Sequence, residues 1–192
     1  MIDASAPFVL LDDARRSDAS PARLYKAPHS TIVATSAVEL EHAFEELRVA
    51  QQAGLHVAGY LSYEAGFALE PKLSNKLEGR HIPTPLCWFG IFDGYTEIAA
   101  DDVPGLLPKP DGSWLGTVRP AISRAADGKA FDAVEDYIEA GDIFQVVLAQ
   151  RFTAPFSLPP IDLYRALRRI NPSPFLYFID LPGFALIGSS PE

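Results

Sequence analysis

The chain has 192 residues, of which 48% are hydrophobic and 21% charged, and this composition is that of a globular protein with one domain or two small ones. Its formal net charge of −9 argues against a nucleic-acid or anionic-membrane partner, although a local pocket of arginines with a metal ion can still bind a dianionic metabolite. A single cysteine excludes a disulfide framework, and the lack of a signal-peptide pattern or of an apolar run near the roughly 18 residues of a membrane span predicts a cytoplasmic protein.

The first hundred residues predict short strands around one helix. Apolar segments predict strands at residues 8–11, 31–34, 57–63 and 86–92. Between the second and third of these, Ser36 opens a capping-box sequence, and apolar residues then recur at helical spacing up to Gly54. Asp93 and Gly94 predict a tight hairpin between strand 86–92 and a strand at 95–98. Cys87 is expected to be a buried small hydrophobe rather than a functional thiol.

Residues 101–120 are rich in Pro, Gly and Asp, which predicts a linker or long loop between a region at 1–100 and one at 121–192. After it we expect a helix ended by Gly141, a long strand at 143–154 and a helix beginning near Pro160. The buried stripe predicted for that last helix consists of Leu163, Tyr164, Leu167 and Ile170. Strands at 175–179 and 184–188, joined by a turn, complete a pattern that favours an α+β fold over a doubly wound sheet.

Three segments after residue 140 carry polar side chains that chemistry could use. In the predicted strand 143–154, alternation places Gln145 and Arg151 on one face, which is either the wall of a cavity or a half-exposed surface, and alternation alone favours the latter. Pro172 and Pro174 make a rigid corner that either presents backbone groups to a ligand or only separates a helix from a strand. Glu192 is either a partly buried acid with a raised pKa or simply a terminal carboxylate.

The three arginines at positions 165, 168 and 169 lie on the polar side of the predicted helix that follows Pro160. Such a group of like charges is usually a solvated face, so we expect these side chains to lie in water rather than to form an anion site.

These segments together resemble the chorismate-utilising enzyme family, over essentially the whole chain. The ordered motifs are Ala-Gly-Asp-Ile-Phe-Gln-Val-Val-Leu, Gln-Arg-Phe, Leu-Tyr-Arg-Ala-Leu, Asn-Pro-Ser-Pro and Gly-Ser-Ser-Pro-Glu. Residues 123–192 are most similar to anthranilate synthase component I, and residues 8–95 to aminodeoxychorismate synthase component I. The resemblance implies the N-terminal portion of a large α/β sandwich, with a catalytic domain that begins at about residue 121 and is cut off at residue 192.

The activity that the resemblance implies is the conversion of chorismate and ammonia to anthranilate and pyruvate in tryptophan biosynthesis. A glutamine amidotransferase subunit would supply the ammonia. The alternatives are formation of 4-amino-4-deoxychorismate for folate biosynthesis, and a non-catalytic module that binds L-tryptophan or the amidotransferase. The 192 residues by themselves are expected to be inactive.

The resemblance also assigns roles to single residues. Glu192 corresponds to the acid that assists departure of the C4 hydroxyl of chorismate, and Ser190 to a substrate contact. Gln145 stands where isochorismate-forming relatives carry a lysine base, and a neutral amide cannot act as that base, which favours amination over hydroxylation. Mg²⁺ is expected on glutamates beyond residue 192, since it prefers oxygen ligands.

A regulatory tryptophan pocket is implied as well. Asp13 replaces a family serine there, and its added negative charge either pairs with the ammonium group of the ligand or abolishes inhibition. The residues that the resemblance assigns to this pocket are Leu11, Asp13, Asn171, Pro174, Phe175 and Leu176.

Overall fold

The structure, a computed structural model, describes residues 6–77, 79–108, 114–157 and 159–190. The chain forms two compact units: residues 1–109 together with 160–192 make the first unit, and residues 110–159 make the second unit. The chain therefore leaves the first unit once and returns to it, whereas the sequence predicts everything after residue 121 in one region. The return follows from strand pairing, because the strand at residues 175–181 bonds to the first strand of the chain.

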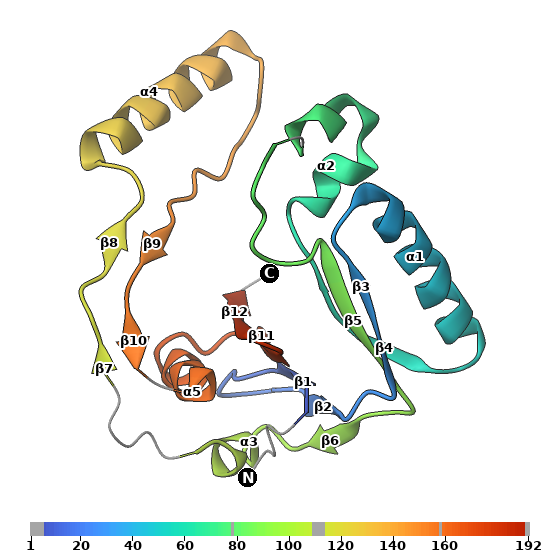
Figure 1. Cartoon of the computed structure of the whole chain (residues 1–192). Coiled ribbons are helices and arrows are strands. Elements are labelled where there is room, and N and C mark those ends of the chain that lie inside the picture. Colours follow the sequence, from blue (N-terminus) through green and yellow to red (C-terminus); the bar gives the residue numbers. More distant parts are fainter. Residues whose placement is uncertain (1–5, 78, 109–113, 158, 191–192) are drawn as a thin grey trace. The chain divides into compact units, whose positions relative to one another are not determined.

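A five-stranded antiparallel sheet is the centre of the first unit (Figure 1). The strand order is β12-β11-β1-β2-β6, so the first strand lies between the second and the eleventh. The bounds are β1 Phe8–Asp12, β2 Ala22–Lys26, β6 Thr96–Ile98, β11 Phe175–Leu181 and β12 Phe184–Ser190.

A second, three-stranded antiparallel sheet has the order β3-β5-β4, and one long helix packs against it. Its strands are β3 Ser30–Ala34, β4 His56–Leu61 and β5 Cys87–Phe92, and the helix is α1 Ala37–Gln52. Two short helices, α2 Ala65–Leu69 and the 3₁₀ helix Pro71–Lys76, follow β4. As predicted, the Ser36 hydroxyl caps α1 by accepting from the Glu39 backbone N–H. The Glu39 carboxylate in turn accepts from the Thr35 backbone N–H.

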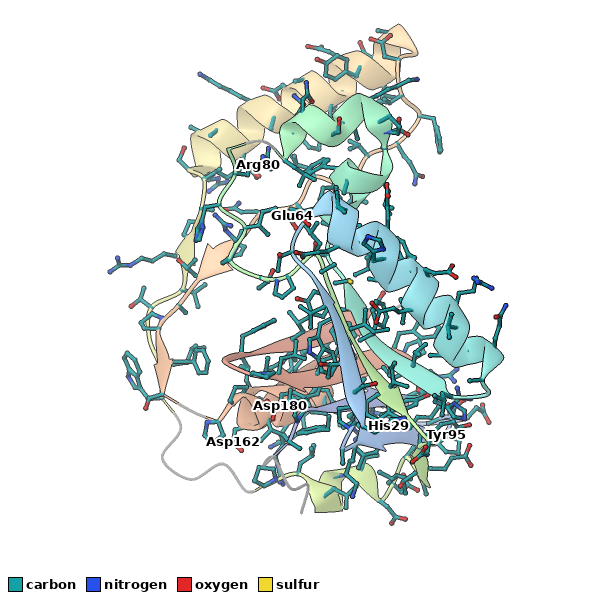
Figure 2. The ribbon with its side chains drawn as sticks, turned by 45° about the vertical axis from the view of Figure 1, so that its right-hand side comes forward. His29, Glu64, Arg80, Tyr95, Asp162 and Asp180 are labelled. Carbon is teal, nitrogen blue, oxygen red and sulfur yellow. The ribbon has the colours of Figure 1, made fainter. Side chains whose placement is uncertain are left out.

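The predicted hairpin at Asp93 and Gly94 is wrong. Strand β5 already has β3 on one edge and β4 on the other, so both of its rows of backbone groups are paired. The segment that follows it therefore crosses to the other sheet, where β6 bonds to β2. Tyr95, which directly precedes β6, lies beside that edge strand (Figure 2).

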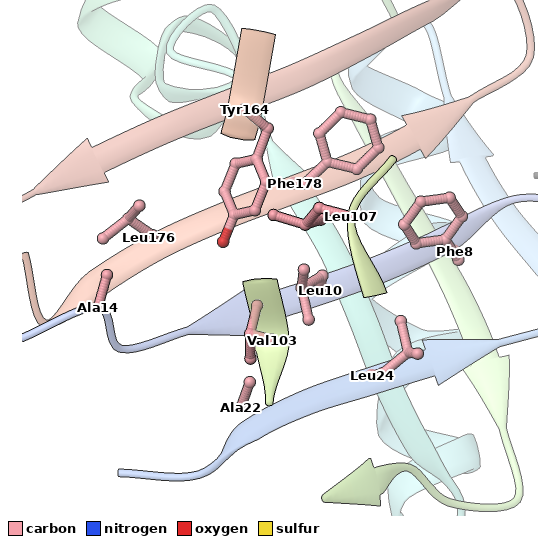
Figure 3. Packing of buried hydrophobic residues seen from close by; sticks show 10 residues of the cluster. All are labelled: Phe8, Leu10, Ala14, Ala22, Leu24, Val103, Leu107, Tyr164, Leu176 and Phe178. Carbon is pink, nitrogen blue, oxygen red and sulfur yellow. The ribbon is translucent and has the colours of Figure 1, made fainter. Parts of the chain in front are cut away.

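Three apolar clusters stabilise the first unit. One lies on the face of the five-stranded sheet that α5 (Pro160–Ile170) and α3 (Val103–Leu106) cover, and there the ring of Tyr164 of α5 packs at a tilt against that of Phe178 (Figure 3). The second joins the opposite face of that sheet to the three-stranded sheet through Val9, Trp88 and Ile179. The third lies under α1 and includes Cys87, which is fully buried as predicted.

Helix α5 begins at Pro160 as predicted, but its buried stripe is only partly right. Tyr164 is fully buried, whereas Leu163 and Ile170 are exposed. The face that α5 turns to the sheet runs through Ile161, Tyr164 and Arg168. This face is not the purely apolar stripe, because the buried Asp12 on β1 requires an arginine as its partner.

The second unit contains helix α4 (Arg124–Ala140) and two short strand pairs. The Ser123 hydroxyl caps the first turn of α4. Gly141 ends the helix with a positive φ of 79°, as expected. Strand β7 (Trp114–Leu115) pairs with β10 (Phe156–Ser157), and β8 (Arg119–Pro120) pairs with β9 (Phe152–Thr153). Among the described residues, no helix is long and apolar enough to cross a membrane.

The long strand predicted at 143–154 is therefore wrong, since only residues 152 and 153 of it are extended and paired. A strand persists only where a neighbouring backbone accepts and donates its hydrogen bonds. Residues 143–151 have no described strand beside them, and the two apolar residues Phe144 and Val147 are almost fully exposed. The assignment of alternate residues to two faces does not hold for this segment.

Candidate functional site

An apolar cleft lies over the ends of β1 and β11 in the first unit. Alternation along β1 directs Leu10 and Asp12 to the face covered by α5, and Leu11 to the opposite face. The cleft, called here the β1–β11 cleft, has a volume of about 600 Å³. Its lining residues are Leu11, Asp12, Asp13, Arg15, Ser20, Pro21, Arg23, Pro174, Phe175, Leu176 and Tyr177.

Five of the six residues predicted for a regulatory pocket line this cleft together, namely Leu11, Asp13, Pro174, Phe175 and Leu176. They come from the first strand and from the corner that precedes β11, and the β1–β11 pairing brings them together from opposite ends of the sequence. The sixth, Asn171, is not among the lining residues and holds the corner in place instead.

Asp12 is held by a buried network that connects β1 to α5. Its carboxylate accepts from the Arg168 Nε at 2.7 Å and from the Tyr164 hydroxyl at 2.6 Å, and its side chain has no exposed surface. Arg168 also donates to the Ala100 carbonyl. Burial, followed by the Asp12 charge, raises the pKa of Tyr164 far above its ordinary value, so the hydroxyl stays a donor.

The prediction that the arginines of α5 form a solvated face is thus wrong for two of them. Arg168 neutralises Asp12, and Arg165 donates to the carbonyls of Leu107 and Pro108. Arg169 is exposed, as expected. A buried carboxylate requires a cation beside it, and Arg168 is the one that this helix rotation supplies.

The Asp13 carboxylate accepts hydrogen bonds from residues of the loop that follows it. The Arg15 guanidinium donates to both of its carboxylate oxygens, at 2.7 Å and 3.0 Å for the closest pairs, and the backbone N–H of Ser20 donates at 2.9 Å. The hydrogen bond from Arg15 is the main reason that the pKa of Asp13 lies well below its usual range, and the Ser20 N–H lowers it further. The charge that this position adds to the cleft is therefore already neutralised.

The Asn-Pro-Ser-Pro corner is tied to strand β12 by side-chain hydrogen bonds. The Asn171 amide donates to the Ser189 hydroxyl at 3.0 Å, and Ser189 in turn donates to the Asn171 carbonyl. The buried Ser173 hydroxyl lies 2.9 Å from the same Ser189 oxygen. Ser190, a predicted substrate contact, follows Ser189 at the end of β12 and pairs in register with Phe175, a residue of the cleft.

A second cleft, called here the Gly59 cleft, adjoins the first and has a volume of about 420 Å³. Leu11 and Tyr177 line both clefts. The remaining lining residues of the Gly59 cleft come from both sheets and are Gly59, Tyr60, Leu61, Ser62, Thr84, Ile179 and Leu186. The Tyr60 hydroxyl donates to the Pro85 carbonyl, so it is not free to meet a ligand in this arrangement.

The two predicted catalytic residues are not brought together by the described part of the chain. Glu192 lies outside the described residues, and Gln145 is exposed in the irregular segment of the second unit. A shared cavity for these two side chains stays a prediction. Within the described ranges no three His, Cys, Asp or Glu side chains lie close enough to share a metal ion. The Mg²⁺ ligands expected beyond residue 192 stay a prediction.

Sequence reasoning missed Arg23 and the Asp12–Arg168 pair. Asp12 directly follows an apolar run and occupies an inward position by alternation, which is a signal that it would be buried and would need a partner. Nothing in the sequence distinguishes Arg168 from the neighbouring arginines as that partner. Arg23 lies on a strand that sequence reasoning did not predict.

Small-molecule sites in proteins are typically apolar clefts with a few polar or charged groups, and the β1–β11 cleft has this composition. The family model described as chorismate binding enzyme matches residues 6–192, and the chain belongs to this family.

Among curated proteins, the chain is similar to several named anthranilate synthase component 1. That of Cereibacter sphaeroides is 47% identical over 78 residues, which are 41% of this chain and 16% of the relative. That of Bacillus pumilus is 53% identical over 64 residues, or 33% of this chain and 12% of the relative. That of Thermus thermophilus is 50% identical over 71 residues, or 37% and 15%. The matched part of the chain thus spans only about an eighth to a sixth of each relative.

Proposed function

We propose that this chain is part of component I of a chorismate-aminating synthase, which forms anthranilate and pyruvate from chorismate and ammonia. The observation that carries the proposal is the identity of about one half to relatives named anthranilate synthase component 1, within a chain of the chorismate-binding family. In the proposed reaction ammonia adds to the ring, the C4 hydroxyl leaves as water, and loss of pyruvate then gives the aromatic product.

Two residues have proposed roles in that reaction. Glu192 protonates the departing hydroxyl, and Gln145 provides a neutral amide where a base that activates water would otherwise stand. A glutamine amidotransferase subunit is the proposed source of ammonia. Mg²⁺ is proposed to bind glutamates beyond residue 192.

The test is a turnover assay on the complete protein with chorismate, ammonium and Mg²⁺, in which the products are separated by chromatography. Anthranilate is the expected product. 4-Amino-4-deoxychorismate would instead support the folate-pathway alternative, and isochorismate alone would refute amination. We expect Glu192→Gln to lower turnover about a hundredfold or more, as loss of a general acid does. Glu139→Gln, an exposed change in α4, is the matched control and should leave turnover unchanged.

A second function is favoured by the β1–β11 cleft, which gathers five of the six predicted regulatory residues. We propose that the cleft is an allosteric site for a small ring-bearing metabolite, of which L-tryptophan is the first to test. Inhibition of turnover by a ligand that does not compete with chorismate would support this. Competitive kinetics with chorismate would contradict it.

A further inference from the structure

A groove runs between strand β3 of the three-stranded sheet and helix α1. We propose that this groove, called here the β3–α1 groove, binds an extended segment of a partner protein. The segment adds a strand to the edge of β3 and places a lysine or arginine side chain against α1. The proposal does not depend on the proposed reaction or on the β1–β11 cleft.

Strand β3 is paired on one side only. Its backbone bonds to β5, and among the described residues no strand lies along its other edge. In an edge strand, alternate residues direct their backbone N–H and C=O groups away from the sheet, where another extended chain can pair with them. Ser30, Thr31 and Val33 are exposed, so this edge is open in the described part of the chain.

The sequence of β3 favours such pairing. Natural edge strands are commonly protected by a charged residue, a proline or a bulge. The strand reads Ser-Thr-Ile-Val-Ala, without a charged residue or a proline, and its β-branched residues suit an extended backbone. Its register with β5 runs without interruption from Ser30 to Ala34, so there is no bulge. Strand β3 therefore lacks the three features that usually keep an edge from pairing.

Helix α1 forms the second wall of the groove. It follows β3 after a short connection and packs against the three-stranded sheet (Figure 1). The groove has a volume of about 320 Å³, and its lining residues are Thr31, Ile32, Val33, Glu39, His42, Ala43 and Glu46. The spacing of the four helix residues places them on one face of α1. A groove between an edge strand and a second wall suits peptide binding by strand addition, in which main-chain hydrogen bonds give affinity and side-chain contacts give specificity.

The charge of the helix wall specifies the side chain that it takes. The Glu39 carboxylate accepts from the backbone N–H and the hydroxyl of Thr35, and these hydrogen bonds lower its pKa, so it stays ionised at neutral pH. Within the described ranges, neither Glu39 nor Glu46 forms an ion pair. A cationic side chain on the bound strand therefore meets two carboxylates that lack a cation.

The first experiment measures backbone amide hydrogen exchange in the complete protein, with and without the capped heptapeptide Thr-Lys-Val-Lys-Val-Lys-Thr. The three lysines share one face of this peptide when it is extended. We expect alternate N–H groups of β3 to exchange rapidly in the free protein and at least tenfold more slowly with the peptide bound. Slow exchange of every β3 N–H before the peptide is added would show that a second copy or another part of the chain covers the edge. That result would overturn the proposal, as would unchanged exchange at saturating peptide.

Two further peptides separate backbone pairing from attraction of charge alone. Each is N-methylated on alternate amides, and the two sets are complementary. Only the peptide methylated on the amides that face β3 should lose binding, by tenfold or more, because methylation removes the donors of the ladder. Equal affinities of the two methylated peptides would contradict strand addition.

Substitution of one carboxylate tests the charge. Glu46→Gln should weaken the lysine peptide about two- to fivefold, as loss of an exposed ion pair does, and should leave the affinity of the corresponding glutamine peptide unchanged. Glu41→Gln is the matched control, since Glu41 is exposed on the same helix and is not among the residues that line the groove. Equal effects of the two variants would contradict the role of Glu46.

Discussion

The ring of Tyr177 occupies the space in which a side chain at Gly188 would lie. The two residues are direct register partners in β11 and β12, and a Cβ built at position 188 would collide with the ring and the hydroxyl of Tyr177. The same ring lines both the β1–β11 cleft and the Gly59 cleft. Glycine at position 188 therefore helps to set the shape of both clefts. It lies on β12, which ends two residues before Glu192.

Gly188→Ala is expected to displace the Tyr177 ring into the clefts. We expect a loss of about 1–3 kcal/mol in the free energy of unfolding, as for other overpacked sites, measured by urea denaturation. The double variant with Tyr177→Leu should recover most of this loss, because the smaller side chain leaves room for the methyl group. Gly128→Ala in α4, where a Cβ meets open space, is the control and should be neutral or stabilising. Additive losses in the double variant would show that the ring is not the cause.

Arg168→Met should be among the more destabilising single changes on α5. It leaves the Asp12 carboxylate buried without its cation, which typically costs about 3–5 kcal/mol. Arg169→Met, the exposed neighbour, should change stability by no more than about 0.5 kcal/mol. Chemical denaturation of both variants at neutral pH makes the comparison, and equal stabilities would contradict the network described for Asp12.

Ser189→Ala should loosen the Asn-Pro-Ser-Pro corner. It removes the partner of the Asn171 amide and of the buried Ser173 hydroxyl, so we expect a loss of about 1–3 kcal/mol. Faster hydrogen exchange of the Ala14 N–H, which donates to the Ser173 carbonyl, would report the same loosening locally. Ser30→Ala, at an exposed strand position, serves as the control. Unchanged exchange at Ala14 would mean that Ser189 does not hold the corner.

Stability at acid pH should depend on the pair of Asp13 and Arg15. A carboxyl whose pKa is lower in the folded than in the unfolded protein stabilises the fold above its unfolded pKa of about 3.9, and this contribution is lost as the pH falls below that value. Arg15→Gln removes the main cause of the lowered pKa, so its unfolding free energy should fall less between about pH 5 and pH 2 than that of the unchanged protein. Because Arg15 is partly exposed and water screens the pair, we expect a small difference between the two profiles. Parallel pH profiles would refute this assignment.

Local sequence signals were sufficient where one segment determines its own structure. Ser36 predicted the start of one helix and Gly141 the end of another, and apolar runs located most strands of both sheets. The signals failed where a distant partner decides the outcome. The turn at Asp93 and Gly94 has hairpin chemistry, yet β5 has no free edge to pair with.

The candidate site shows the same division. Five of the residues that line the β1–β11 cleft were predicted through a family resemblance, and the structure brings these five together by pairing β1 with β11. The ion pairs beside the cleft were not predictable, because they depend on which arginine reaches which carboxylate. Asp12 lies 156 residues from Arg168 in the sequence, and only the rotation of α5 selects that arginine among its neighbours.

The pairing of β1 with β11 also sets the order of events during synthesis. Strand β1 has neighbours on both sides only after β11 has been synthesised. Phe8 and its register partner Asp180 are about 170 residues apart in the sequence. At translation rates of about 5–20 residues per second, that edge stays open on the ribosome for on the order of 10–30 seconds. An unpaired apolar strand is a template for wrong partners during that time, so the strand that builds the cleft is open to mispairing during synthesis.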